Sequence, residues 1–282
     1  MQDKSFLGCH AGGLHRVAYT EWGQPDAART AVCVHGLTRN GRDFDNLAAA
    51  LAENGWRVVC PDIAGRGKSD WLPSAEHYSF PQYLHDMTAL IARLDVERID
   101  WIGTSMGGLM GMMFAAPANS PLRNLVVNDI GPFIDTPALD EIAEYVGQNP
   151  VFETYEEAEE YIRKTHAGFG KLTDDQWRSL TDSSFAKGKQ GWHLVYDPQI
   201  GDAFRRSARS EIELWAVWDA IACPTLLVRG EDSQTLSSHT AAGMSRRGPA
   251  AKVETIAGCG HAPSLMDDAQ IGLIVDFLRS NS

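Results

Sequence analysis

A serine between two glycines is the residue of this chain best placed to do chemistry. The segment Gly103-Thr104-Ser105-Met106-Gly107 follows an apolar run typical of a strand, and a helix-like run begins directly after it. Gly-x-Ser-x-Gly at a strand–turn–helix junction is the pattern of a nucleophile elbow, which exposes the hydroxyl above the edge of a sheet. Glycines leave room for the strained turn. The sequence therefore predicts Ser105 as a nucleophile.

A histidine near the end of the chain is the predicted base. A serine hydroxyl is a weak nucleophile at neutral pH, so it needs a base, and that base needs an orienting acid. In one hydrolase arrangement the three follow in the order Ser, acid, His. His261, in Gly258-Cys259-Gly260-His261-Ala262-Pro263, follows the last predicted strand and fits this order.

Two loops offer the acid. Asp129 lies in Asn128-Asp129-Ile130-Gly131-Pro132, and Asp232 lies in Arg229-Gly230-Glu231-Asp232-Ser233. Each loop follows an apolar strand-like run, so each leaves the carboxyl edge of the predicted sheet, where ligand sites lie. The residues alone leave both aspartates open.

Two backbone N–H groups are predicted to bind the oxyanion of a tetrahedral intermediate. Such donors must be aimed in advance at the oxygen that gains charge. One is expected from Met106, the residue after the nucleophile. The other is expected from Leu37, because His35-Gly36-Leu37-Thr38 forms the turn after an apolar strand.

These residues require a sheet whose strand ends meet at one edge. Six short, apolar, β-branched runs indicate strands that are buried on both faces, and helix-like segments separate most of them. The runs are 30–34, 56–60, 99–102, 125–127, 225–228 and 252–256. The expected fold is therefore α/β, with a mostly parallel twisted sheet. An opening pair near 5–9 and 14–21 is expected to form an antiparallel hairpin at its edge.

The alternation of strands and helices is interrupted for about 90 residues. It stops at Gly131-Pro132 and resumes near Cys223-Pro224, and the residues between show helical periodicity. A structureless loop of this length is improbable in a compact domain. We therefore predict a core of residues 1–132 and 219–282 and an inserted helical cap, or lid, of residues 133–218.

Composition excludes several classes of partner. The net charge of −12 repels nucleic acid and anionic membranes, and no run of 18 or more apolar residues is present. The first residues lack the apolar region of a secretory signal. Five scattered cysteines are expected to be free thiols in a reducing compartment, which predicts a cytoplasmic protein. The sequence does not decide between a monomer and a homo-oligomer.

No cofactor is predicted. The chain has neither Cys-x-x-Cys nor His-Glu-x-x-His, so nothing signals a metal site. Gly67-Lys68-Ser69 matches the end of a phosphate-binding loop, but Asp62 stands where that motif needs its first glycine. A nucleotide site is therefore not expected.

The combination of motifs resembles the α/β-hydrolases of the capped, single-domain kind. The matching pieces span nearly the whole chain; they are His35-Gly36, Pro61-Asp62-Ile63-Ala64-Gly65-Arg66-Gly67-Lys68-Ser69-Asp70, Gly103-Thr104-Ser105-Met106-Gly107-Gly108 and Gly260-His261. Most members take the acid from a Gly-x-x-Asp loop after the penultimate strand. Here Ser233 stands at that place and Asp232 comes one position early.

An esterase and thioesterase branch of that family is the more similar one. It has serine at this place and takes its acid from the earlier loop, in an Asp-Ile-x-Pro context that Asp129-Ile130-Gly131-Pro132 matches. The resemblance therefore implies Asp129 as the acid in preference to Asp232. It also implies Ser233 as a hydrogen-bonding partner of the acid or of His261.

The predicted function is hydrolysis of a small-molecule carboxylic ester or thioester through an acyl-enzyme on Ser105. Two alternatives stay open at this point. The same triad serves carbon–carbon and lactone hydrolases, and a small-molecule receptor can keep the triad with little turnover. Substrate identity and acyl length are not fixed by the sequence.

Overall fold

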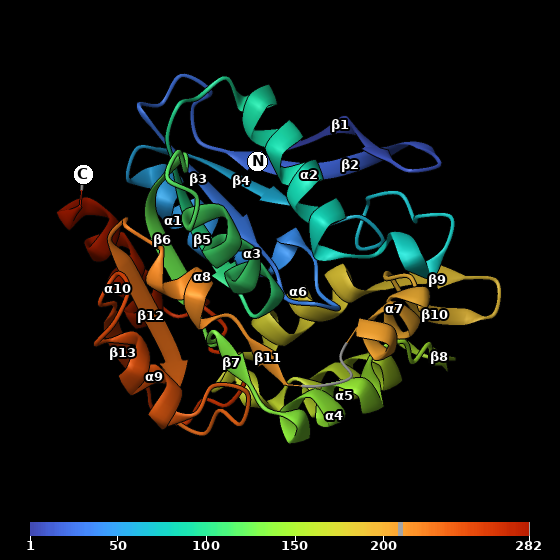
Figure 1. The fold of residues 1–282 in the computed structure, drawn as a ribbon. Coiled ribbons are helices and arrows are strands. Elements are labelled where there is room, and N and C mark those ends of the chain that lie inside the picture. Colours follow the sequence, from blue (N-terminus) through green and yellow to red (C-terminus); the bar gives the residue numbers. More distant parts are fainter. Residues whose placement is uncertain (208–210, 282) are drawn as a thin grey trace.

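An eight-stranded, mostly parallel sheet forms the centre of the protein (Figure 1). The computed structural model describes residues 1–207 and 211–281. The strand order is β1-β2-β4-β3-β5-β6-β12-β13. The strands are Gln2–His10 (β1), Gly13–Trp22 (β2), Arg29–Val34 (β3), Trp56–Pro61 (β4), Ile99–Thr104 (β5), Leu122–Asn128 (β6), Thr225–Gly230 (β12) and Lys252–Ile256 (β13). Strands β3 to β6, β12 and β13 are parallel, which confirms the predicted fold class.

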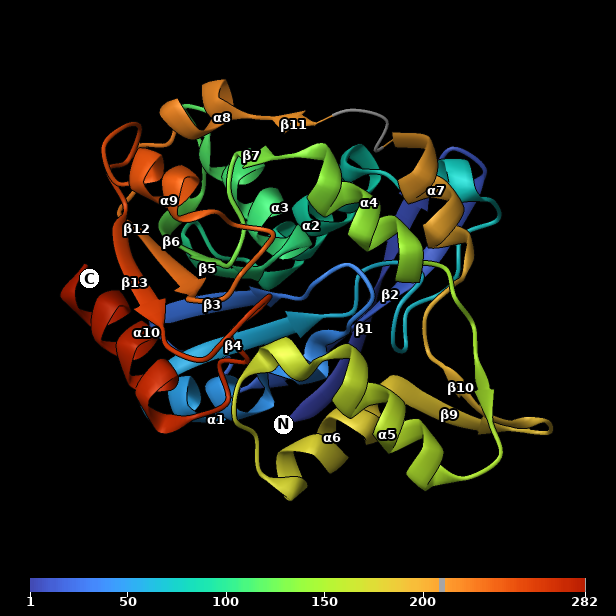
Figure 2. The same cartoon turned by 90° about the horizontal axis from the view of Figure 1, so that it is seen from below.

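Alternating side chains bury both faces of this sheet. In β3, Val32 and Val34 belong to one hydrophobic cluster, whereas Ala31 and Cys33 belong to another on the opposite face. Helices α1 and α10 cover the second face, and α2, α3, α8 and α9 cover the first (Figure 2). These helices are Asp45–Glu53 (α1), Phe80–Leu94 (α2), Met106–Ala115 (α3), Trp215–Asp219 (α8), Ser238–Met244 (α9) and Asp268–Ser280 (α10). Short 3₁₀ turns lie at Gly41–Phe44 (η1) and Ala75–His77 (η2).

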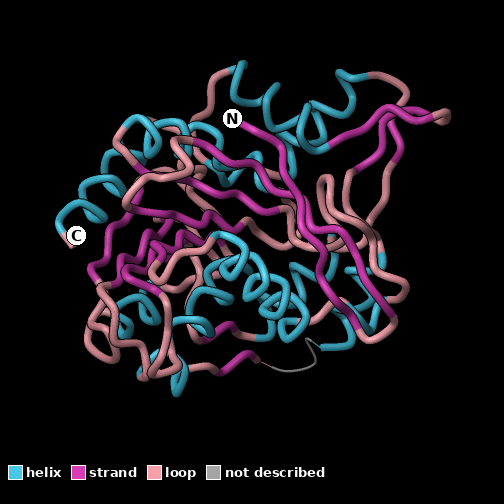
Figure 3. The backbone as a smooth tube through the Cα atoms, turned by 90° about the horizontal axis from the view of Figure 1, so that it is seen from above, coloured by secondary structure: helices cyan, strands magenta, loops and turns pink. Residues whose placement is uncertain are grey.

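The first two strands form a long antiparallel hairpin at one edge of the sheet (Figure 3). Both strands are longer than the predicted 5–9 and 14–21. Strand β2 then pairs antiparallel with β4, whereas β1 lies at the edge of the sheet.

The segment predicted as a cap, residues 133–218, contains helices and two small sheets. We call it the inserted segment; residues 208–210 within it lie outside the described part of the chain. Its elements are Phe133–Ile134 (β7), Thr136–Tyr145 (α4), Val151–Phe152 (β8), Tyr155–Thr165 (α5), Ala167–Phe169 (η3), Asp174–Ser184 (α6), Phe185–Gly188 (β9), Gly191–Leu194 (β10), Gln199–Ser207 (α7), Ile212–Glu213 (β11) and α8. Neither small sheet, β8-β10-β9 or β7-β11, was predicted, because their strands hold only two to four residues.

Two further observations concern the whole described chain. Its five cysteines are free thiols, of which Cys33, Cys60 and Cys259 are buried. Within residues 1–207 and 211–281, no helix combines the length and the apolar character needed to cross a membrane.

Candidate active site

Ser105 lies at a sharp turn between β5 and α3. Its backbone has φ 51° and ψ −114°, a conformation that side-chain-bearing residues rarely adopt. A Cβ on Gly103 would come within 2.1 Å of the Gly107 carbonyl oxygen, and one on Gly107 within 2.0 Å of the Val34 carbonyl oxygen. Glycine is therefore required on both sides of the turn, and Ser105 stands at the N-terminus of α3.

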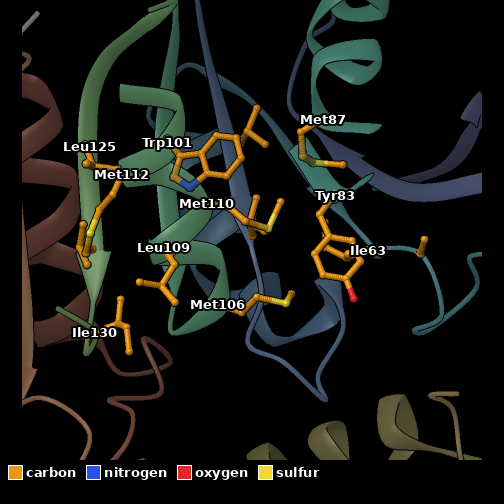
Figure 4. Packing of buried hydrophobic residues seen from close by; sticks show 14 of the residues in the cluster. Ile63, Tyr83, Met87, Trp101, Met106, Leu109, Met110, Met112, Leu125 and Ile130 are labelled. Atoms are coloured by element: carbon orange, nitrogen blue, oxygen red, sulfur yellow. The ribbon is translucent and has the colours of Figure 1, made fainter. Parts of the chain in front are cut away.

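Buried side chains hold α3 against the sheet. Nearly all residues of α3 are buried, among them Leu109 and Met110 (Figure 4). The indole N–H of Trp101, on β5, donates a 2.9 Å hydrogen bond to the Gly107 carbonyl oxygen in the first turn of the helix. The turn that carries Ser105 is thus supported by packing behind it.

Three side chains from separate loops form a continuous hydrogen-bonded chain. His261 follows β13, and its Nε2 lies 2.9 Å from the Ser105 hydroxyl oxygen. Its Nδ1 lies 2.8 Å from Oδ2 of Asp129, which follows β6. The His261 side chain is 23% exposed and Asp129 is fully buried, so the chain runs from the protein interior toward an accessible hydroxyl.

Asp129 is held by groups on the loop after β12. Its Oδ1 accepts a 2.8 Å hydrogen bond from the Gly230 N–H, and its Oδ2 accepts one of 2.6 Å from the Ser233 hydroxyl. The Ser233 hydroxyl oxygen also accepts from the Leu236 N–H at 3.1 Å. Ser233 thus contacts the aspartate and not the histidine, and these bonds fix the carboxylate that faces His261.

The alternative acid, Asp232, lies apart from this chain. Its side chain is exposed, and its backbone N–H donates to the Cys259 carbonyl oxygen at 2.8 Å. Among the described residues, the structure contains no hydrogen bond between Asp232 and His261. Asp232 therefore supports the histidine loop through its backbone.

The two backbone groups predicted to bind an oxyanion lie beside Ser105. A Cβ on Gly36 would lie 3.8 Å from the Ser105 Cβ, so the turn that contains Leu37 passes close to the serine. Met106 begins α3, where backbone N–H groups lack helical acceptors and the helix dipole favours negative charge. In the described part of the chain, neither the Leu37 nor the Met106 N–H donates to a protein acceptor.

A buried histidine fixes the turn before Leu37. The Nδ1 of His35 donates to the Gly36 carbonyl oxygen at 2.7 Å, and its Nε2 accepts from the Ile63 N–H at 3.0 Å. Complete burial lowers the pKa of His35 to about 3. His35 is therefore neutral and joins the ends of β3 and β4.

The inserted segment contacts the site directly, which the sequence did not predict. The Gly260 N–H donates to the Gly168 carbonyl oxygen at 2.8 Å, so η3 is bonded to the loop that carries His261. Beside the turn that contains Leu37, the Arg39 N–H donates to the Gly36 carbonyl oxygen. The Arg39 guanidinium donates to the Ser184 hydroxyl of the inserted segment at 2.6 Å. Nothing in the local sequence around Gly168 or Ser184 signals these contacts.

A cavity of about 710 Å³ lies away from these residues, between the β1–β2 hairpin and α6. Its lining is of mixed charge, and ion pairs such as Lys68–Asp3 and Arg178–Asp175 occupy its charged groups. Ser105 and His261 do not line it, so we place the chemistry at the edge of the sheet and not in this cavity.

The family of the chain follows from its match over most of its length. Residues 31–268 match the alpha/beta hydrolase fold family. The chain belongs to the α/β-hydrolase family. The expectation drawn from the motifs is thus confirmed.

Several α/β-hydrolases are similar to this chain over nearly its full length. A 3-hydroxybutyrate-oligomer hydrolase of Cupriavidus necator is 47% identical over 94% of this chain and 93% of its own. An alpha/beta hydrolase structure from Novosphingobium aromaticivorans has a TM-score of 0.87 at 34% identity, covering 99% of this chain and 98% of that one. The E-2-(acetamidomethylene)succinate hydrolase structure has a TM-score of 0.85 at 23% identity, covering 99% and 100%, and supports the fold alone.

Metal ligands are not grouped in the part of this α/β-hydrolase that the structure describes. No three His, Cys, Asp or Glu side chains lie there so that they could hold a metal ion. The Ser105 hydroxyl contacts an imidazole, which suits proton transfer. The Leu37 and Met106 N–H groups, which have no acceptor in the described part of the chain, suit the stabilisation of an oxyanion.

Proposed function

We propose that this protein is a serine hydrolase that cleaves the ester bonds of short, linear hydroxyalkanoate oligomers through an acyl-enzyme. The observation that carries the proposal is the hydrogen-bonded chain Ser105–His261–Asp129. A hydroxyl joined in this way to an imidazole and a buried carboxylate is the arrangement that activates serine toward acyl carbon.

Acylation begins with proton transfer. His261 Nε2 accepts the Ser105 proton as the serine oxygen attacks the ester carbonyl carbon, and Asp129 stabilises the imidazolium through Nδ1. The carbonyl oxygen becomes an oxyanion held by the Leu37 and Met106 N–H groups. His261 then gives its proton to the leaving alkoxide, which departs as an alcohol and leaves Ser105 acylated.

Deacylation reverses these roles with water. His261 takes a proton from a water molecule as the water oxygen attacks the acyl carbon, and a second oxyanion forms in the same place. The tetrahedral intermediate collapses, the Ser105 oxygen leaves and recovers a proton from His261, and a carboxylic acid is released.

The substrate class rests on the relative from Cupriavidus necator. A 3-hydroxybutyrate-oligomer hydrolase that is 47% identical over 94% of this chain supports the same class of ester here. In such a substrate every cleavage produces one hydroxyl end and one carboxylate end, so both products are hydroxy acids.

The experiment compares wild type with Ser105→Ala on a linear 3-hydroxybutyrate dimer and trimer, with release of the monomer measured by chromatography. We expect turnover by wild type and a loss of at least about 10⁴-fold in kcat for the variant. Equal activity of the two proteins would exclude the mechanism. Activity on aryl esters of simple fatty acids without activity on the oligomers would keep the mechanism and overturn the substrate class.

Two controls separate the alternatives. Labelling of Ser105 by a fluorophosphonate tests for an activated nucleophile, and absence of labelling together with tight ligand binding would favour a receptor. Turnover of a dienoate-type diketone in preference to any ester would favour a carbon–carbon hydrolase.

A further inference from the structure

Arg66 is a completely buried cation that contacts both residues expected to supply the oxyanion donors. Its Nε donates to the Leu37 carbonyl oxygen at 2.8 Å, and its Nη2 lies 3.7 Å from the Met106 sulfur. Its Nη1 donates to the Ala64 carbonyl oxygen at 2.8 Å and to the Tyr83 hydroxyl at 2.9 Å. The Met106 thioether extends toward the Tyr83 ring (Figure 4), and Arg66 bonds to both.

The charge of Arg66 is not balanced by an adjacent carboxylate. Within residues 1–207 and 211–281, no acidic side chain forms an ion pair with it. Its guanidinium lies 4.9 Å from the Tyr83 ring centroid and 5.9 Å from that of Tyr78, whose hydroxyl donates to buried Asp197 at 2.6 Å. Asp197 is thus bonded to the Tyr78 hydroxyl, and among the described residues it forms no ion pair with Arg66.

Burial of such a cation costs free energy unless an anion compensates it. Here the compensation comes from carbonyl dipoles, a phenol and ring faces, and the thioether is a weak acceptor for Nη2. His35 adds no charge, because its pKa is lowered to about 3 by burial and, to a smaller extent, by Arg66 and Arg39. Arg66 is therefore a buried positive charge in contact with Leu37 and Met106 before any reaction starts.

An oxyanion beside Leu37 and Met106 would be the missing negative charge. It exists only in the tetrahedral intermediate and in the transition states around it. A fixed cation in a buried site stabilises this oxygen more than it stabilises the neutral ester, and such differential stabilisation accelerates the chemical step. The bonds to Leu37 and Met106 also restrict the two residues that carry the donors.

We propose that Arg66 is a positioning residue for the oxyanion hole, which holds Leu37 and Met106 in place and favours the charged intermediate over the neutral substrate. This inference rests on the proposed serine hydrolase function. It predicts a selective effect: loss of Arg66 lowers kcat and leaves KM nearly unchanged.

The experiment uses the whole chain and two ketones of the same chain length. A trifluoromethyl ketone adds to the Ser105 oxygen and carries an oxyanion, with the serine proton moving to His261, whereas the matched methyl ketone binds without forming the adduct. The inhibition constants of both are measured for wild type, Arg66→Met and Arg66→Lys. Arg93→Met, which removes a cation outside the site, is the control.

We expect Arg66→Met to lower kcat by roughly 10–100-fold and to weaken the trifluoromethyl ketone by a similar factor. The methyl ketone should bind as it does to wild type, and Arg66→Lys should recover part of the loss because it keeps a charge. Arg93→Met should stay within about twofold of wild type in every measurement.

Three results would overturn the inference: equal weakening of both ketones, an unchanged kcat in Arg66→Met, or an Arg66→Lys variant no better than Arg66→Met. If Arg66→Met does not fold, Arg66→Lys is compared with wild type, and equal weakening of the two ketones again overturns it. Failure of the proposed function is distinct, because wild type itself would neither hydrolyse esters nor prefer the trifluoromethyl ketone.

Discussion

The protein contains two His–Asp pairs with nearly the same distance between nitrogen and oxygen. One is His261–Asp129 at the carboxyl edge of the sheet, with 2.8 Å between nitrogen and oxygen. The other joins His15 on β2 to Asp86 on α2, with 2.9 Å between Nε2 and Oδ2. In both pairs the aspartate is almost completely buried.

The two pairs differ in what the other ring nitrogen meets. The second nitrogen of His261 contacts the Ser105 hydroxyl, and its side chain is 23% exposed. The His15 side chain is 2% exposed, and its Nδ1 is buried without a hydrogen-bond partner among the described residues. The centroid of the neighbouring His10 ring lies 5.5 Å from that of His15.

An imidazole–carboxylate pair is therefore not by itself a site. The pair at the hairpin joins β2 to α2, whereas the pair at the sheet edge adds a hydroxyl, access to solvent and unpaired backbone donors. Variants of both pairs test whether this difference in surroundings decides the role.

The largest effect is expected from Asp129→Asn. We expect kcat to fall by about 10⁴-fold, because an amide favours the wrong tautomer of His261 and cannot stabilise the imidazolium. Asp86→Asn and Asp232→Asn are the controls and should stay within about twofold. Steady-state kinetics on the 3-hydroxybutyrate oligomer tests this. An inactive Asp232→Asn variant together with an active Asp129→Asn variant would refute the assignment of the acid.

The next effect concerns stability, and here the larger loss is expected at the His15–Asp86 pair. His15→Ala should lower the free energy of unfolding by about 1–3 kcal/mol, because Oδ2 of buried Asp86 loses its partner and only the Gln82 amide still donates to this carboxylate, at Oδ1. His261→Ala should abolish activity with a smaller loss of stability, since its ring is partly solvated. Urea denaturation of both variants measures these stabilities. If the kcat of His15→Ala fell by more than the loss of folded protein explains, the comparison would be contradicted.

A smaller effect is expected from Ser233→Ala. The variant removes the 2.6 Å hydrogen bond to Asp129, whereas the Gly230 N–H stays in place. A hydrogen bond to a charged group contributes about 1.5–3 kcal/mol; since the Gly230 N–H still holds the carboxylate, we expect the lower end of this range, a fall in kcat of roughly tenfold. Ser237→Ala, on the same loop but at the start of α9, is the matched control; an equal loss in both variants would assign Ser233 to folding alone.

The smallest effect extends the comparison to a histidine with no carboxylate partner. His35 has a folded pKa of about 3, below the ordinary 6.5, so the unfolded chain binds its proton more readily. Stability from His35 is therefore present above pH 6.5 and lost as the pH falls toward 3, by about 1.4 kcal/mol per pH unit. The slope of the unfolding free energy against pH measures how many more protons the unfolded chain binds. For His35→Gln, urea denaturation between pH 6.5 and 4.5 should give a slope that corresponds to nearly one proton fewer than for wild type. An unchanged slope would contradict the neutral, buried ring.

Much of the fold could be predicted because its signals are local. Near-continuous apolar runs such as 125–127 indicate buried strands, and the glycines around Ser105 indicate a sharp turn, without reference to any distant residue. The choice between Asp129 and Asp232 depended on family resemblance, because both follow strands that end at one edge. The structure brings Asp129, and not Asp232, to His261; the catalytic roles of these residues stay predictions.

Other features depend on contacts that no local pattern encodes. His15 and Asp86 are 71 residues apart, and the inward position of Arg66 follows from the packing of Tyr83 and Met106 around it. The strands β8, β9 and β10 are too short for a period of two to stand out. Such features depend on the three-dimensional structure and cannot be predicted from local sequence patterns.

The hydrogen bond between Gly168 and Gly260 couples the inserted segment to the loop that carries His261. A displacement of η3 that breaks this bond removes a backbone restraint from the loop that carries His261. Movement of the inserted segment relative to the sheet would therefore act on the position of the proposed base.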